Sequence, residues 1–129
     1  EFKKLSIIGR YKKNKINKTF NYLGKLKNNI DVINKYNAAI INAGFSALSE
    51  IYLLKKPSVI VPVPNHSEQY LNAKRLEHLG VAIFSKEKDI FKNLLILKKN
   101  FYRYRKKFSK IEVINGSILA AKFIMNRRN

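Results

Sequence analysis

Short apolar runs alternate with polar stretches and turn residues along the chain, a pattern typical of a small α/β protein. In the amino-terminal third, a β-branched run closed by Gly9 predicts a buried strand, and a second, weaker strand is expected to end at Gly24. The expected elements of this part are a strand at Lys4–Gly9, a strand at Thr19–Leu23 and a short helix at Asn29–Lys35.

The middle of the chain predicts the order strand, helix, strand, helix, strand. Pro57 ends the first helix, Ser67 is a suitable N-cap for the second, and Gly80 ends the second. Continuous apolar strands joined by helices through short connections are typical of βαβ units and a parallel sheet. The strands are expected at Ala38–Asn42, Ser58–Val63 and Val81–Phe84, and the helices at Ser46–Lys55 and Ser67–Leu79.

The carboxy-terminal part, residues 86–129, predicts a helical tail. Helices are expected at Glu87–Lys99 and Ser109–Asn126, with Tyr102–Lys107 as a basic joint or an extra turn between them. Neither an internal repeat nor a low-complexity linker divides the sequence. Residues 1–129 are therefore expected to form one domain, which agrees with the chain length.

Composition narrows the class of protein. Apolar residues make up 46% of the 129 residues, enough for one sizeable core and too many for a disordered basic tail. The absence of cysteine excludes disulfides, thiolate nucleophiles and cysteine-based zinc sites. Because no apolar run reaches the roughly 18 to 20 residues of a membrane span, a cytoplasmic protein is expected.

Charge is the strongest compositional feature of the chain. The 27 Lys and Arg against 8 Asp and Glu give a formal net charge of +19. Basic residues gather in residues 2–27 and 86–110, and such blocks favour polyanions or the anionic face of a bilayer. Nucleic acid is not favoured as the partner, because no nucleic-acid-binding motif accompanies the charge.

A loop after the expected strand Ala38–Asn42 carries candidate chemistry, because ligands of open parallel sheets bind beyond the carboxyl ends of the strands. Gly44 permits close approach of the backbone, and the following helix start offers N–H groups to an anion. Ser46 and Glu50 share one face of that helix, and a carboxylate there suits the two hydroxyls of a ribose. Alternatively, Ser46 is only a cap residue and Glu50 a solvated position.

A second loop follows the expected strand Ser58–Val63. Glu68, Gln69 and Asn72 cluster on the first turn of the next helix, where carboxylate and amide groups match sugar hydroxyls. Alternatively, they form an ordinary polar helix start in which Asn72 bonds locally. His66 lies in the same loop, with either a structural role or a contact to the bound ligand.

Taken together, the two loops resemble the donor-binding region of family 28 glycosyltransferases. The shared pattern is Gly-x-x-x-x-x-Glu, an apolar strand between two prolines, an acidic-Gln pair and Asn-Ala, with all spacings kept over residues 41–80. It is formed here by Gly44 with Glu50, Pro57 with Pro62, Glu68-Gln69 and Asn72-Ala73. The family includes the N-acetylglucosaminyltransferase that acts on lipid-linked muramoyl-pentapeptide, and it is related to the UDP-glucuronosyl and plant UDP-glucosyl transferases.

This resemblance implies a fold and a phosphate site. The fold would be the C-terminal half of a GT-B type transferase, a Rossmann-like parallel sheet with flanking helices, here lacking its first strand. Gly44 and the backbone of Ser46 and Ala47 would approach the diphosphate of a UDP-sugar, and Glu50 would hold the ribose. The helix dipole would stabilise the leaving group, so neither a metal nor another cofactor is expected.

The resemblance also implies a sugar site, and it is not complete. Glu68 and Gln69 would contact the transferred sugar, while Asn72 would support that loop or touch the sugar or phosphate. Plant and animal relatives have a His where this chain has Asn42, and a phosphate-contacting Ser or Thr where it has Ala47. Both departures weaken the expectation of catalysis more than that of donor binding.

A complete transferase of this type also needs an acceptor domain, which 129 residues cannot hold as well. The chain is therefore expected to be a fragment or a split subunit, inactive without an acceptor domain or a partner chain, with the general base outside it. Without the first strand, the strands Lys4–Gly9 and Ala38–Asn42 either leave a gap that another chain fills or pair directly.

The predicted function is the donor-binding part of an inverting, metal-independent transferase that passes a hexose-type sugar from a UDP-sugar to a lipid-linked acceptor. Two alternatives stay open: a degenerate, non-catalytic basic domain that binds polyanions or a partner subunit, and a nucleotide-sugar epimerase. Basic and aromatic residues interleave in residues 98–108, which predicts peripheral attachment to the anionic cytoplasmic face of a membrane. Alternatively, these aromatics pack the terminal helices onto the sheet.

Overall fold

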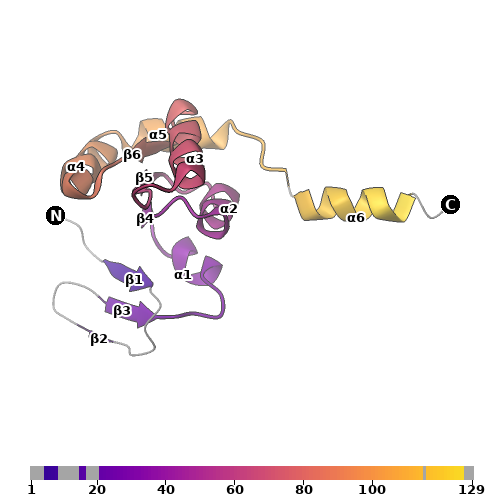
Figure 1. The fold of residues 1–129 in the computed structure, drawn as a ribbon, viewed down its shortest axis with the longest axis horizontal. Coiled ribbons are helices and arrows are strands. Elements are labelled where there is room, and N and C mark those ends of the chain that lie inside the picture. The colour runs from indigo at the N-terminus through magenta and orange to yellow at the C-terminus, as the bar shows by residue number, and fades with distance from the viewer. Residues whose placement is uncertain (1–4, 9–14, 17–20, 115, 127–129) are drawn as a thin grey trace. The chain divides into compact units, whose positions relative to one another are not determined.

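The computed structural model describes residues 5–8, 15–16, 21–114 and 116–126. It divides into two compact units, residues 1–37 and 38–129 (Figure 1). Each unit holds its own three-stranded sheet, and the fold is α/β with parallel strands and flanking helices, as expected from the sequence. The prediction of one domain concerns how the two units pack together, and it stays a prediction.

The first unit is built on a small mixed sheet. Its elements are β1 (Ser6–Ile8), β2 (Lys15–Ile16), β3 (Asn21–Gly24) and α1 (Ile30–Asn34). Strand β3 lies in the middle, parallel to β1 and antiparallel to β2. Three elements expected from the sequence are thus confirmed within the described residues, whereas β2 falls in a polar, basic stretch where no strand was expected.

The second unit contains the parallel sheet that the alternating pattern predicts. Its strands are β4 (Ala39–Ile41), β5 (Ser58–Ile60) and β6 (Ala82–Phe84), in the order β4-β5-β6 and all parallel. Helix α2 (Phe45–Leu53) connects β4 to β5, and α3 (Ser67–His78) connects β5 to β6. Strands β1 and β4 belong to separate units, so the direct pairing that the sequence left open stays a prediction.

The core of the second unit lies between this sheet and the helices that follow it. Val59 of β5 and Ile83 of β6 pack against Leu97 of α4 (Ile90–Lys99), and Tyr104 of α5 (Phe101–Ser109) lies at the margin. Because strand residues alternate between faces, Ile60 points to the opposite face, and it too is fully buried. The sheet is therefore covered on both faces, as the apolar composition of β5 predicts.

Helices α2 and α3 end in the same backbone motif. After α3, the Gly80 N–H donates to the Glu77 carbonyl and the Val81 N–H to the Leu76 carbonyl, with Gly80 at a φ of +69°. After α2, the N–H groups of residues 55 and 56 donate to the carbonyls of residues 52 and 51, with Lys55 at a φ of +50°. Both are Schellman motifs, which turn the chain sharply into the next strand.

Two expected boundaries around β5 are wrong. The strand Ser58–Val63 is shorter than expected and ends at Ile60, because Pro62 and Pro64 have no N–H for a ladder. The N-cap of α3 is His66, with extended backbone angles, and Ser67 is already the first helical residue. His66 makes no side-chain cap hydrogen bond, so the loop path rather than a cap side chain sets this helix start.

The expected layout of the helical tail also needs correction. Tyr102–Lys107 is not a joint but the body of α5, because its Arg and Lys favour helix and Tyr104 and Phe108 form an apolar stripe. The last helix begins at Gly116 rather than Ser109, and β-branched residues in the stretch before it disfavour helix. No helix of the described residues is both long and apolar enough to cross a bilayer.

Candidate functional site

The loop between β4 and α2 forms the first half of the candidate site. Gly44 is the N-cap of α2, and its backbone N–H donates to the side-chain Oδ1 of Asn42 at 3.3 Å. A Cβ at Gly44 would lie 3.3 Å from that same oxygen, so a side chain here would crowd the turn. Asn42 thus shapes this loop, and Gly44 keeps its backbone accessible.

The start of α2 is suited to an anion. The Leu48 N–H makes the first intrahelical bond, to the Gly44 carbonyl, so the preceding N–H groups of the first turn have no intrahelical acceptor. The first turn carries no acidic residue, and the positive end of the helix dipole is therefore not offset there. Ser46 is exposed and Ala47 half-buried, while the half-buried Glu50 follows Ser46 by one turn.

The loop between β5 and α3 forms the second half. Asn65 takes a left-handed conformation with a φ of +60°, and the His66 N–H closes a turn onto the Val63 carbonyl at 3.2 Å. Gln69, only 9% exposed, accepts a hydrogen bond from the Val63 N–H through Oε1 at 3.0 Å. The first turn of α3 therefore holds its own approach loop in place.

Asn72 connects the two halves. Its side-chain Nδ2 donates to the backbone carbonyl of Ala43 at 3.4 Å, and Ala43 is fully buried between Asn42 and Gly44. This contact joins the second helical turn of α3 to the loop at the start of α2. The carboxyl ends of neighbouring parallel strands meet at one edge of the sheet, so both loops border one region.

The predicted site residues fall into three groups. Asn42, Gly44 and Asn72 meet in the contacts just described. Gln69 lies at this edge, where its carbonyl oxygen accepts a hydrogen bond from the Val63 N–H and its amide N–H groups are the donors that it could offer to a ligand. The remaining members are Ser46 and Ala47 in the first turn of α2, Glu50 one turn further along α2, His66 at the cap of α3 and Glu68 in the first turn of α3.

Another residue at this edge was missed in the sequence. Ser85 directly follows β6, is 2% exposed, and its Oγ accepts a hydrogen bond from Asn93 Nδ2 at 2.9 Å. Its backbone N–H donates to the Ile60 carbonyl, which ties the end of β6 to the end of β5. The available signal was a polar residue directly after an apolar strand.

Fold and loops together define a Rossmann-like α/β domain with polar helix starts at the carboxyl edge of a parallel sheet. The family model of the glycosyltransferase family 28 C-terminal domain matches residues 1–110. The chain belongs to this family, and the resemblance seen in residues 41–80 is confirmed.

Individual relatives agree with this assignment. The chain is similar to an uncharacterized glycosyltransferase of Methanopyrus kandleri, with 43% identity over 58 residues, or 43% of this chain and 17% of the relative. It is also similar to proteins named UDP-N-acetylglucosamine–N-acetylmuramyl-(pentapeptide) pyrophosphoryl-undecaprenol N-acetylglucosamine transferase. The protein of this name from Clostridium tetani is 32% identical to the chain, over 57% of this chain and 22% of the relative. The one from Parabacteroides distasonis is 45% identical, over 46% of this chain and 18% of the relative. The matched stretches thus span about a fifth of each relative.

Proposed function

We propose that the chain is the donor-binding part of an inverting, metal-independent glycosyltransferase that uses a UDP-sugar. The hexose-type sugar would pass to a lipid-linked acceptor, by analogy with the relatives named as N-acetylglucosamine transferases of a pyrophosphoryl-undecaprenol substrate. The single observation that carries the proposal is the contact of Asn72 with Ala43, because it unites two differently charged helix starts in one site.

The start of α2 suits the diphosphate of the donor. Its N–H groups and uncompensated dipole favour negative charge, and the same interactions grow stronger as charge develops on the departing nucleoside diphosphate. Gly44 lets the diphosphate approach the backbone around Ser46 and Ala47. Glu50, one turn further along α2, would accept hydrogen bonds from the ribose hydroxyls.

The start of α3 suits the sugar. Glu68 in its first turn places a carboxylate at the positive helix end, which disfavours a second phosphate site and favours hydroxyl donors. Gln69 would offer its amide N–H groups, because Val63 occupies its carbonyl oxygen. His66 and Asn42 would border the donor from the two loops, and Asn72 would hold the loops at a fixed separation.

The acceptor and the general base would come from elsewhere. In this proposal, an acceptor-binding half, either in the same longer protein or in a partner chain, completes the cleft and deprotonates the acceptor. The relatives support it, since each extends far beyond the matched stretch. Transfer by the chain alone is therefore not expected, whereas UDP binding is.

Isothermal titration calorimetry of this chain with UDP tests the proposal. Gly44→Ala should weaken UDP binding by at least about tenfold, because the new Cβ crowds Asn42 Oδ1 at the phosphate turn. Gly44 has a φ of −66°, so alanine is tolerated by the backbone and the melting temperature should change little. Gly116→Ala, where nothing lies within 4 Å, is the matched control. No UDP binding at millimolar concentration would contradict the proposal.

The charge of +19 supports one competing candidate, a non-catalytic domain that binds polyanions. A salt titration of binding to random duplex DNA separates the two, since sub-micromolar affinity at physiological salt with a steep salt dependence is expected only for a polyanion-binding domain. A nucleotide-sugar epimerase would bind UDP as well. Product analysis with the acceptor half present distinguishes it, because an epimerase releases an altered nucleotide sugar and a transferase a glycosylated acceptor.

A further inference from the structure

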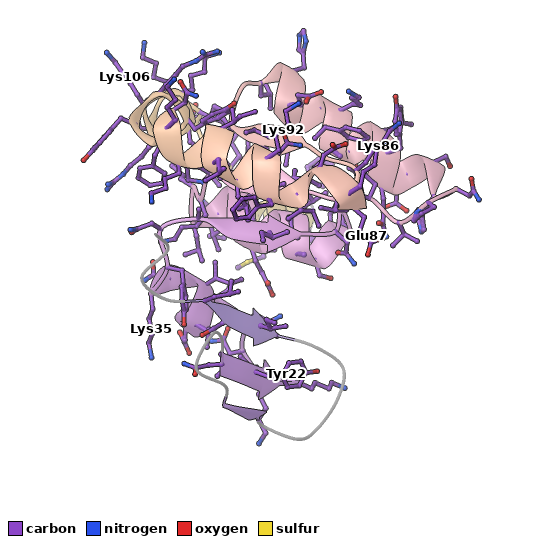
Figure 2. All side chains as sticks on the ribbon, turned by 90° about the vertical axis from the view of Figure 1, so that its left-hand side faces the viewer. Tyr22, Lys35, Lys86, Glu87, Lys92 and Lys106 are labelled. Carbon is purple, nitrogen blue, oxygen red and sulfur yellow. The ribbon has the colours of Figure 1, made fainter. Side chains whose placement is uncertain are left out.

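Helix α5 presents cations beside segments that precede the strands of the parallel sheet. Its exposed Arg and Lys side chains, named here the α5 cations, are Arg103, Arg105, Lys106 and Lys107. The Nζ of Lys107 extends over Gly80, just before β6, where an added Cβ would lie 2.5 Å from it. In Figure 2, Lys106 lies at one end of the layer that α4 and α5 form, and Lys86 lies toward its other end.

Two more cations from the loop before β5 join this cluster. The Nζ of Lys55 donates to the Ser109 carbonyl, at the end of α5, at 3.3 Å. Partial burial, and after it the charge of Arg105, lowers the pKa of Lys56 below its ordinary value of 10.5. Cations of two separate segments thus lie close enough to repel each other, and such a cluster attracts an extended anionic surface.

The position of the cluster relative to the candidate donor site is informative. The loops before β5 and β6 lie at the amino ends of these strands, whereas the donor loops follow the carboxyl ends. Each strand is three residues long, about 10 Å from end to end. A surface bound at the amino edge would therefore leave the donor site open.

The aromatic residues of α5 do not supply the apolar contact expected from the sequence. Phe108 is 1% exposed and packs against Tyr52 with ring centroids 5.8 Å apart, and Tyr104 packs against the core. Of the four, Phe101 is half-buried and packs edge-on against Tyr102, with ring centroids 6.0 Å apart, so Tyr102, at 83% exposure, is the aromatic residue of α5 most available for an apolar surface. The structural alternative thus holds for most of this segment.

Helix α6 (Gly116–Asn126) supplies apolar surface instead. None of its residues is buried, and its large apolar side chains are 53% to 70% exposed: Ile118, Leu119, Phe123, Ile124 and Met125. An exposed helix of this composition is usually covered by protein or lipid. The charge around it favours lipid, since residues 98–129 contain ten Lys and Arg and a single acid, Glu112.

We propose that α5 and α6 together form a membrane-binding device for an anionic bilayer. The α5 cations, with Lys55 and Lys56, meet the lipid headgroups, and the apolar side chains of α6 enter the headgroup–acyl boundary. Stable attachment to a membrane generally needs two weak signals, and this segment provides one electrostatic and one apolar signal. The proposal does not depend on donor binding, because it involves neither α2 nor α3.

Co-sedimentation of the chain with vesicles tests the proposal, without UDP, so that its outcome is separate from that of the proposed function. Vesicles of phosphatidylcholine with about one third phosphatidylglycerol should bind the wild type, and pure phosphatidylcholine vesicles should not. Changing the α5 cations to Gln should lower the partition coefficient by at least about tenfold. Raising NaCl from about 0.1 M to about 0.5 M should lower the partition coefficient of the wild type by a similar factor. This salt test does not depend on the folding of a variant.

A second variant tests α6 separately. Leu119→Gln, Ile124→Gln and Met125→Gln together remove apolar surface without changing charge, and should also weaken binding by about tenfold or more. The matched controls are Lys35, Lys86, Lys88 and Lys92 changed to Gln, and Leu53, Leu71 and Phe91 changed to Gln, all exposed side chains elsewhere. Both controls should bind like the wild type.

Several outcomes would overturn the proposal. These are equal binding to neutral vesicles, unchanged binding of either test variant, an equal loss in the charge control, or insensitivity to salt. Displacement from vesicles by stoichiometric duplex DNA or by an acidic protein would assign the cluster to that class of partner instead. Circular dichroism melts check that each variant is folded. If a variant does not fold, the salt titration of the wild type still decides whether the attachment to vesicles is electrostatic.

Discussion

The Nδ2 of Asn72 lies 3.4 Å from the carbonyl oxygen of Ala43, and this long hydrogen bond spans two helix starts that are 29 residues apart in sequence. Asn72 lies in α3 one turn after Glu68, and Ala43 lies directly before Gly44, the N-cap of α2. A single amide therefore couples the proposed phosphate turn to the proposed sugar loop.

Asn72→Ala should reduce UDP-sugar affinity more than it reduces stability. Loss of the contact frees the Ala43 loop, and a net effect of about 1 kcal/mol, or about fivefold in affinity, is expected. Asn100→Ala is the matched control, because the Asn100 Nδ2 donates to the Ile96 carbonyl at the end of α4 and touches neither loop. Calorimetry and thermal melts of both variants check this, and an equal loss of affinity in the two would contradict the coupling.

Glu50→Gln should weaken UDP binding by roughly 1.5–3 kcal/mol, about tenfold or more, through the loss of charge-assisted hydrogen bonds to the ribose. The melting temperature should change little, because Gln keeps the size of the side chain and its capacity for hydrogen bonds. Titration with UDP measures this, with Glu87→Gln as control. Strong destabilisation with unchanged UDP affinity would make Glu50 a structural residue.

Gly80→Ala should lower the free energy of unfolding by about 1–2 kcal/mol, because Gly80 has a φ of +69°. The added Cβ would meet mainly the flexible end of Lys107, so backbone strain accounts for most of the loss. Lys55→Gly, at the same position of the same motif, should not destabilise the protein. Urea unfolding of both variants tests the pair, and a neutral Gly80→Ala would contradict it.

Arg105→Gln should raise the pKa of Lys56 toward 10.5. Burial and the Arg105 charge both lower this pKa, and the substitution removes the second cause. Because the folded pKa lies below the unfolded value, the unfolded chain holds more protons between the two, and stability rises with pH across that window. The pH profile of Lys56 acylation, read by mass spectrometry, measures the change. Lys86→Gln should leave the profile unaltered, and an unaltered profile in Arg105→Gln would contradict the prediction.

Most elements of the second unit could be predicted because their boundaries carry local signals. Gly80 ends α3 through its left-handed conformation, and Val59 and Ile60 identify a strand buried on both faces. The errors occur where local signals compete. Ser67 is a good cap residue in isolation, yet the turn at Asn65 starts the helix one residue earlier.

The candidate site was predictable at the level of which loops meet, since parallel strands place their carboxyl ends at one edge. The orientation of individual side chains was not predictable. Gln69 turns its carbonyl oxygen toward Val63 because the loop path exposes that N–H, and no pattern in the sequence encodes this path. The roles of Glu50, Glu68 and His66 toward a donor stay predictions.

The central place of β5 has a consequence for hydrogen exchange. Its backbone is hydrogen-bonded to β4 on one side and β6 on the other, and Ser58, Val59 and Ile60 are all fully buried. Its amides donate alternately to the two neighbours, so exposing the whole strand requires separation from both, and these amides should be among the slowest to exchange in this unit. Protection from exchange should then fall over the few residues from Ile60 to Asn65. The proposed donor loops therefore begin where the most persistent backbone structure ends and the backbone can adapt to a ligand.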